Sequence, residues 1–114
     1  MPVTADQARK IALSLPEAEE KSHFDRPDFR VRNKIFASLH AAEKRIVVKL
    51  GPEEQAMLVE SEPKVFAPVP GGWGRKGWTQ VNLSAANAAI LREAVTRGWR
   101  NAAPKTLVKA LDAS

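Results

Sequence analysis

Residues 23–50 read HFDRPDFRVRNKIFASLHAAEKRIVVKL, and this stretch decides the fold class. It contains short alternating runs rich in Phe, Val and Ile, interrupted at Arg26-Pro27, at Arg32-Asn33 and across residues 41–44. Branched and aromatic residues favour strands, and Pro, Asn and Gly mark the breaks between them. The stretch therefore predicts three or four antiparallel strands.

The alternation also predicts how these strands face. Successive side chains on a strand point to opposite sides of a sheet, so Phe29 and Val31 share one face while Arg30 and Arg32 share the other. One face of the sheet is thus expected to be apolar and the other basic. In residues 45–50 apolar residues occupy both parities, which predicts a central strand covered on both sides.

Helical patterns flank these strands. Thr4 and Gln7 form a capping box before an amphipathic run that stops at Pro16. A second helix begins at Gly51-Pro52 and ends before Pro63. Residues 63–77 hold three prolines and four of the six glycines, which is typical of a loop.

After that loop, residues 78–83 (WTQVNL) return to period two and predict another strand. Ser84 is placed to cap a long helix anchored near its end by Trp99, and Pro104 precedes a last short helix. The order α-β(3-4)-α-β-α-α predicts a single two-layer α+β domain over residues 1–114, with an antiparallel sheet of about 4–5 strands and helices packed on it.

Composition narrows the function classes. The 114 residues include no cysteine, which excludes disulfides, thiolate nucleophiles and Cys-based metal sites. No apolar run has the length of a signal peptide core or a membrane span, so a cytoplasmic protein without membrane contact is expected. The net charge is +5 with a pI of about 9.9. The basic residues are concentrated in residues 26–49 and 75–114, and such segregated charge suits an anionic partner.

The loop PGGWGRKGWT at residues 70–79 matches the pattern G-x-G-x-x-G between Gly72 and Gly77. A dinucleotide fingerprint needs a strand before this pattern and a helix after it, and neither is expected here. Two interpretations remain. The glycines permit tight turns while Trp73 or Trp78 fills the core; alternatively, Arg75 and Lys76 between the two indoles bind an anion or a nucleic acid.

Other constellations give weaker signals. His23, Asp25, Asp28 and His40 include metal-binding residue types, but they lack the paired short spacings of a metal site, and no metal or other cofactor is expected. No serine lies in a nucleophile motif. A protein without catalytic activity is therefore expected, and an enzyme using His23 with a carboxylate is the weaker alternative.

Four quoted segments together resemble the MmcQ/YjbR family of small bacterial proteins. They are LSLPEAEEKSHFDRPDFRVRNKIFASL, VVKLGPEEQAML, PVPGGWGRKGWTQVNL and WRNAAPKTL. The resemblance implies an α+β fold akin to secretion-chaperone-like domains. It also implies a DNA-binding role, and it provides no catalytic residues. The loop glycines and tryptophans, and the tail residues Trp99, Arg100, Pro104 and Lys105, fit the family pattern.

These observations lead to the hypothesis of a DNA-binding domain that contacts phosphates through a basic sheet face and the Gly/Trp loop. The predicted interface residues are Arg30, Arg32, Lys34, Trp73, Arg75, Lys76, Trp78, Arg100 and Lys105. The alternative is a module that binds a protein or a small anionic ligand, with the loop as one wall of a groove. An exposed Trp73 favours nucleic acid, and a closed pocket under the loop favours the small ligand. The oligomeric state is not specified by these patterns.

Overall fold

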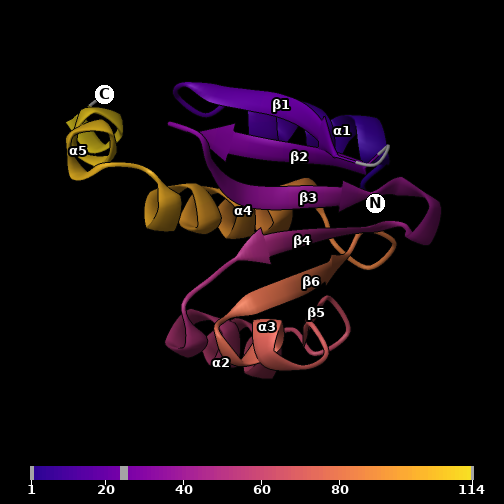
Figure 1. Ribbon diagram of the computed structural model, residues 1–114. Coiled ribbons are helices and arrows are strands. Elements are labelled where there is room, and N and C mark those ends of the chain that lie inside the picture. The colour runs from indigo at the N-terminus through magenta and orange to yellow at the C-terminus, as the bar shows by residue number, and fades with distance from the viewer. Residues whose placement is uncertain (1, 24–25, 114) are drawn as a thin grey trace.

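Six strands form one antiparallel sheet in the computed structural model, which describes residues 2–23 and 26–113. The strand order is β1-β2-β3-β4-β6-β5 (Figure 1). The strands are β1 (Ala18–His23), β2 (Arg26–Val31), β3 (Lys34–His40), β4 (Arg45–Lys49), β5 (Phe66–Pro68) and β6 (Trp78–Asn82). The α+β class is confirmed. Strand β4 is central, and Ile46, Val47 and Val48 are all buried, so side chains on both of its faces are covered as its apolar sequence predicts.

The turn between β2 and β3 changes the predicted assignment of side chains to the two faces of the sheet. Arg32 and Asn33 both have positive φ angles, 50° and 67°, as two-residue hairpin turns require. Phe29 and Val31 do share the buried face. The prediction that Arg32 shares a strand face with Arg30 is wrong, because Arg32 lies in the turn beyond the end of β2.

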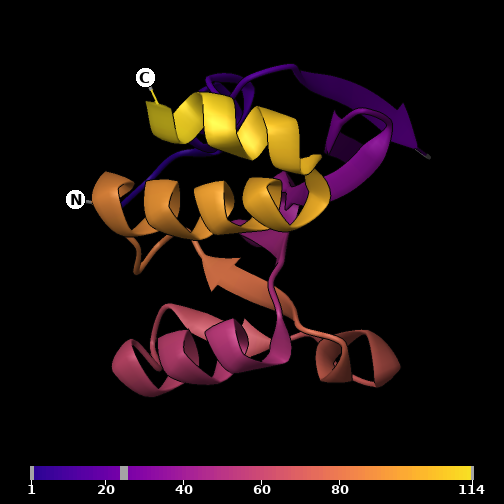
Figure 2. The same ribbon diagram turned by 90° about the vertical axis from the view of Figure 1, so that its left-hand side faces the viewer.

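The helices are distributed unevenly around the sheet. They are α1 (Ala5–Leu13), α2 (Pro52–Ser61), α3 (Gly72–Arg75), α4 (Ala88–Ala102) and α5 (Lys105–Ala113), with a 3-10 turn η1 (Ala41–Glu43). Helices α1 and α4 lie behind the sheet in Figure 1, and α2 and α3 lie at its β5–β6 end. Figure 2 shows α5 running alongside α4. One face of the central strands is therefore covered by helices and the other is left open.

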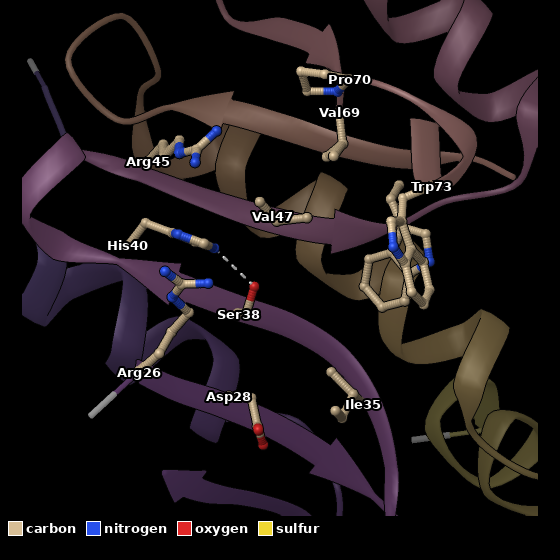
Figure 3. A pocket seen from close by; sticks show the side chains of 11 residues that line it. Arg26, Asp28, Ile35, Ser38, His40, Arg45, Val47, Val69, Pro70 and Trp73 are labelled. Atoms are coloured by element: carbon tan, nitrogen blue, oxygen red, sulfur yellow. Dashed lines mark hydrogen bonds between the residues drawn. The ribbon is translucent and has the colours of Figure 1, made fainter. Parts of the chain in front are cut away.

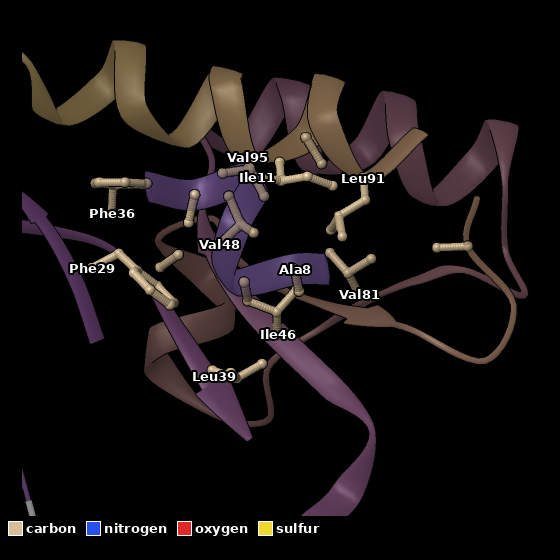
Figure 4. Packing of buried hydrophobic residues seen from close by; sticks show 14 of the residues in the cluster. Ala8, Ile11, Phe29, Phe36, Leu39, Ile46, Val48, Val81, Leu91 and Val95 are labelled. Carbon is tan, nitrogen blue, oxygen red and sulfur yellow. The ribbon is translucent and has the colours of Figure 1, made fainter. Parts of the chain in front are cut away.

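The core fills the space between the sheet and helices α1 and α4. Phe36, Ile46 and Val48 from the sheet meet Leu91 and Val95 of α4 (Figure 4), and all five are fully buried. Trp99 is also fully buried, and its indole N–H donates to the Pro16 carbonyl at 2.9 Å. This bond links the end of α4 to the turn that follows α1 and confirms the anchoring role expected of Trp99.

Three local features differ from the sequence-based expectation. Residues 18–22 precede the stretch in which strands were predicted, yet they belong to the exposed, acidic edge strand β1, which is paired with β2. The segment 63–77, expected to be a loop, contains the short strand β5 and the one-turn helix α3. Helix α4 is capped by Asn87, whose side chain accepts from the Ile90 amide at 2.8 Å, and not by Ser84. Among the described helices, none has the length and apolar character needed to cross a membrane.

Candidate binding site on the open sheet face

A cavity of about 750 Å³ lies on the open face of the sheet, and we call it the trough. Its lining comes from four strands and the loop before α3, through residues Arg26, Asp28, Ile35, Ser38, His40, Arg45, Val47, Val69, Pro70, Trp73 and Trp78. Figure 3 shows the apolar Ile35 and Trp73 toward one end, with Arg26, His40 and Arg45 gathered at the other. The trough thus has an aromatic end (Ile35, Trp73, Trp78) and a cationic end (Arg26, His40, Arg45).

The aromatic end is formed by the two loop tryptophans. Trp73 is 62% exposed, and its ring lies edge-on to Trp78 with centroids 5.9 Å apart and planes at 78°. The Lys76 ammonium lies 5.4 Å from the Trp73 ring centroid, within the range of a cation–π contact. Neither tryptophan is a core residue like Trp99. The loop instead holds one indole against the sheet and presents the other to solvent.

Two glycines in the loop are required by close backbone approaches. A Cβ at Gly74 would lie 1.8 Å from the Val69 carbonyl oxygen, and one at Gly77 would lie 1.9 Å from that of Leu50. Gly77 also has a φ of +111°, which residues with a side chain rarely adopt. Gly72 has open space around it. The G-x-G-x-x-G match therefore reflects packing of this loop, in agreement with the rejection of a dinucleotide fingerprint.

A glutamine from α2 fixes the loop from behind. The Gln55 amide nitrogen lies 3.0 Å from both the Gly74 and Trp78 carbonyl oxygens. It also lies 3.2 Å from the hydroxyl of Thr79, which is fully buried and donates to the Gly77 carbonyl at 2.8 Å. These bonds satisfy polar groups that the turn leaves inside the protein. These hydrogen bonds consequently fix the turn that positions Trp73.

The cationic end arises where three strand ends meet. Strand β2 begins at Arg26, β3 ends at His40 and β4 begins at Arg45, with His40 paired directly to Arg45 across the sheet. Arg45 is held by Glu43, 2.5 Å from its Nε, and donates from Nη1 to the Gln80 side chain. The Arg26 side chain has no ion pair or hydrogen-bond partner within residues 2–23 and 26–113.

His40 is half-buried between these arginines and contacts a serine. Its Nε2 lies 3.1 Å from the Ser38 hydroxyl oxygen. Burial lowers the pKa of His40, the charges of Arg26 and Arg45 lower it further, and Glu43 acts in the opposite direction. The imidazole is therefore neutral at pH 7, and the Ser38–His40 pair offers neutral donors and acceptors between two guanidinium groups.

Several predicted interface cations are already paired with carboxylates. Arg30 makes two hydrogen bonds to Asp28, at 2.8 and 3.2 Å, and Arg32 makes two to Glu17, at 2.6 and 3.1 Å. The Asp28 and Glu17 hydrogen bonds raise the pKa values of Arg30 and Arg32, respectively. Arg100 of α4 is likewise bonded to Asp112 of α5.

The remaining predicted residues divide between two places. Trp73, Arg75, Lys76 and Trp78 lie together around α3, with both cations exposed. Lys34 is exposed at the start of β3, next to Ile35 of the aromatic end. Lys105 is exposed at the start of α5 and, like Arg100, is not part of the trough lining. The structure therefore brings together the loop residues but not the whole predicted set.

Sequence reasoning missed the cationic end, since it had not assigned Arg26, His40 and Arg45 to one surface. A signal was available, because Leu39 and Ile46 are apolar and their neighbours His40 and Arg45 must point to the opposite face. Asp25 of the considered metal set lies outside the described residues, as does the His23 side chain. Within the part of the chain that the structure describes, no three His, Asp or Glu side chains form a metal-binding group.

Fold and site together define a class: an α+β domain whose antiparallel sheet is covered by helices on one face and carries an aromatic and cationic trough on the other. The chain belongs to the YjbR family, whose model matches residues 13–101. This confirms the resemblance recognised in the sequence segments.

A solved structure shows the same fold. The crystal structure of Deinococcus radiodurans protein DR2400, a DUF419 domain, is similar with a TM-score of 0.72 and 24% sequence identity. The match covers 85% of this chain and 76% of that protein. No curated protein matches the chain. The comparisons thus establish family and fold, and the role of the trough has to be argued from its own geometry.

Proposed function

We propose that this protein binds nucleic acid through the open sheet face, with an unpaired base stacked on Trp73 and phosphates held by nearby cations. The observation that carries the proposal is the exposed Trp73 indole at the end of a trough that also holds Arg26 and Arg45. Stacking on an aromatic side chain beside a cationic groove is the common mode of single-strand binding. No base sequence is specified by such contacts.

The exposure of Trp73 is better explained by ligand binding than by a role in stabilising the fold. Large aromatic side chains contribute most to a fold when buried, as Trp99 is. Trp73 leaves most of its surface in water, although Gln55, Gly74 and Gly77 hold its loop firmly. A rigid, exposed indole loses little conformational entropy when a base stacks on it.

The geometry favours an unpaired strand over a duplex. Bases in a duplex are stacked on one another and present only their edges, so their faces are not accessible to Trp73. The trough lies between side chains of the β-strands and the loop at Pro70, and this shape suits a flexible single-stranded nucleic acid. Lys34, Arg75 and Lys76 are exposed near its aromatic end and are available to neighbouring phosphates. Arg30, Arg32 and Arg100 are bonded to carboxylates and contribute less.

Fluorescence anisotropy with labelled oligothymidylate and a duplex of the same length, across a salt series, tests this proposal. The single strand is expected to bind more tightly, with a slope of roughly −0.7 per phosphate contact in a plot of log affinity against log salt. Trp73→Ala should weaken binding by about 1–3 kcal/mol. Met57→Ala is the matched control, because Met57 is 46% exposed on α2, outside the trough. Equal binding by the wild type and Trp73→Ala would contradict the proposal.

A small anionic ligand is the second candidate, favoured by the size of the trough. About 750 Å³ lies within the range of roughly 300–1,000 Å³ typical of small-molecule sites. An aromatic anion would place its ring at Trp73 and its charge at Arg26 and Arg45. Calorimetric titration with aromatic carboxylates and nucleotides separates this candidate from the first, because it predicts saturable binding of a monomeric ligand without affinity for the oligonucleotide.

A further inference from the structure

Beyond stacking, we infer that the cationic end of the trough is a subsite for a phosphate monoester, which makes a nucleoside monophosphate group the ligand class. This inference rests on the proposed function, because it assumes that the base lies at Trp73. The group has two possible sources, a free nucleotide or the phosphorylated end of a strand. Both present a planar base and a terminal phosphate with three oxygens.

The spacing of the two ends supports this assignment. Along β4, Arg45 begins the strand, and Lys49 is paired with Trp78 of the aromatic end. Four residues of strand span roughly 13 Å between backbones. The Arg26 and Arg45 side chains extend into the trough from one end and the Trp73 ring from the other (Figure 3). The floor between them is apolar at Val47 and suits the uncharged body of a ligand.

Several hydrogen-bond donors at the cationic end remain available to a ligand. The Arg26 side chain makes no hydrogen bond or ion pair with another described residue, so its guanidinium is available to a ligand. Arg45 has its Nε on Glu43 and its Nη1 on Gln80, which leaves Nη2. The His40 ring lies between the two arginines, and the Ser38 hydroxyl lies 3.1 Å from its Nε2 (Figure 3). Planar guanidinium groups suit phosphate, and two of them beside a hydroxyl can satisfy three terminal oxygens.

Among the described residues, the carboxylates near this end are already paired with arginines. Asp28 is bonded to Arg30, with only 7% of its side chain exposed, and Glu43 is bonded to Arg45. The end therefore carries a net positive charge, from Arg26, that no acidic side chain of β2, β3, β4 or η1 cancels. A phosphate monoester has a charge of about −1.5 to −2 at pH 7, larger than that of the diesters inside a strand. The cationic end should therefore favour the terminal phosphate of a nucleic-acid strand over a phosphate inside the strand.

His40 couples this subsite to pH. The charged groups facing it are Arg26 and Asp28 from β2, Arg45 from β4 and Glu43 from η1. A bound phosphate would offset the arginine charges that disfavour the imidazolium, so ligand binding should be accompanied by proton uptake at His40. Through His40, affinity for the phosphorylated ligand should therefore increase as the pH falls, down to about pH 6, where the phosphate itself begins to take up a proton and lose charge.

The test compares a labelled single strand carrying a terminal phosphate with the same strand ending in a hydroxyl, by competition anisotropy. A nucleoside monophosphate and the parent nucleoside are titrated in parallel by calorimetry. The phosphate is expected to improve binding by roughly tenfold. Arg26→Ala should abolish that difference. Lys109→Ala, which removes an exposed charge on α5 outside the trough, should preserve it.

The outcomes separate this inference from the proposed function. If both strands bind within twofold of each other, the phosphate subsite is contradicted while nucleic-acid binding stands. If the nucleoside monophosphate binds and neither strand does, the subsite is supported with a free nucleotide as its source, and the nucleic-acid proposal fails. If no strand and no nucleotide binds, both are overturned. Because Arg26 is exposed, its alanine variant should fold, and circular dichroism checks this.

Discussion

The two faces of the sheet are made by the same strands but differ in composition and burial. In β4, Ile46 and Val48 are fully buried under α4, whereas Arg45 and Val47 on alternate positions line the trough. The covered face is apolar apart from Thr79, the fully buried cross-strand partner of Val48. The open face mixes an exposed indole, aliphatic side chains, two arginines and a histidine. Such a mixture contributes little to stability and suits ligand recognition, so under the proposed function one face of the sheet stabilises the fold and the other binds.

The largest expected effect comes from the covered face. Phe29→Ala removes a fully buried ring and should lower the free energy of unfolding by about 3–5 kcal/mol, because it leaves a cavity as well as losing apolar burial. Urea denaturation measures this loss. Ile35→Ala on the open face, where the side chain is 36% exposed, should cost less than about 2 kcal/mol. Equal losses at the two positions would contradict the division between the faces.

The Gly/Trp loop is expected to be sensitive to substitution at Gly77. Gly77→Ala should destabilise the protein by about 2 kcal/mol or more, because the new Cβ meets the Leu50 carbonyl and φ is positive. Since this loop presents Trp73, oligonucleotide binding should weaken as well. Gly72→Ala is the matched control, because a Cβ there meets no atom within 4 Å. Thermal unfolding and anisotropy of both variants test whether the loop is preorganised.

A smaller effect is expected at Glu54 of α2, which is bonded to Arg97 and Asn101 of α4. Burial would raise the pKa of Glu54, but hydrogen bonds from Asn101, the Gly51 amide and Arg97 hold it below its ordinary value. Its contribution is therefore fully present above about pH 4.5 and is lost as the pH falls below that value. Glu54→Gln should cost about 1–2 kcal/mol at pH 7 and flatten this part of the stability profile. If the free energy of unfolding of the variant fell below about pH 4.5 as steeply as that of the wild type, the bonds of Glu54 would not contribute to stability.

The smallest expected effect belongs to His40 in the free protein. Because its folded pKa is below 6.5, the unfolded chain binds the proton more readily, so stability should decrease as the pH falls below about 6.5. His40→Gln should remove this component of the pH dependence and leave stability at pH 8 nearly unchanged. Midpoints of urea denaturation at several pH values between about 5 and 8 measure it. The same slope in the variant would assign the titration to another group.

The sequence predicted the fold well because its main signals are local. The Thr4–Gln7 capping box is present in α1, and the alternation around Phe29 and Val48 placed both residues in the core. Two features escaped because non-local pairing created them. Strand β1 has a charged, exposed sequence and exists through its ladder with β2, while β5 has only three residues next to β6.

The candidate site was predicted only in part, for similar reasons. In the loop that the sequence singles out, Trp73 contacts both Lys76 and Trp78, but the sequence does not indicate which indole is exposed. The pairing of Arg32 with Glu17 depends on the left-handed turn and on β1. The cationic end depends on the register of three strands. These are relations between distant segments, which single-sequence patterns do not encode.

The most direct test of ligand binding on the open face uses the three tryptophan indole N–H signals in a nuclear magnetic resonance titration with oligothymidylate. Trp73 and Trp78 belong to the trough, and Trp99 lies in the core bonded to Pro16. The account predicts saturable shifts of the Trp73 and Trp78 signals together with the amides around Ser38 and Val47, while the Trp99 signal stays in place. Shifts confined to α4 and α5, with both trough indoles unchanged, would contradict it.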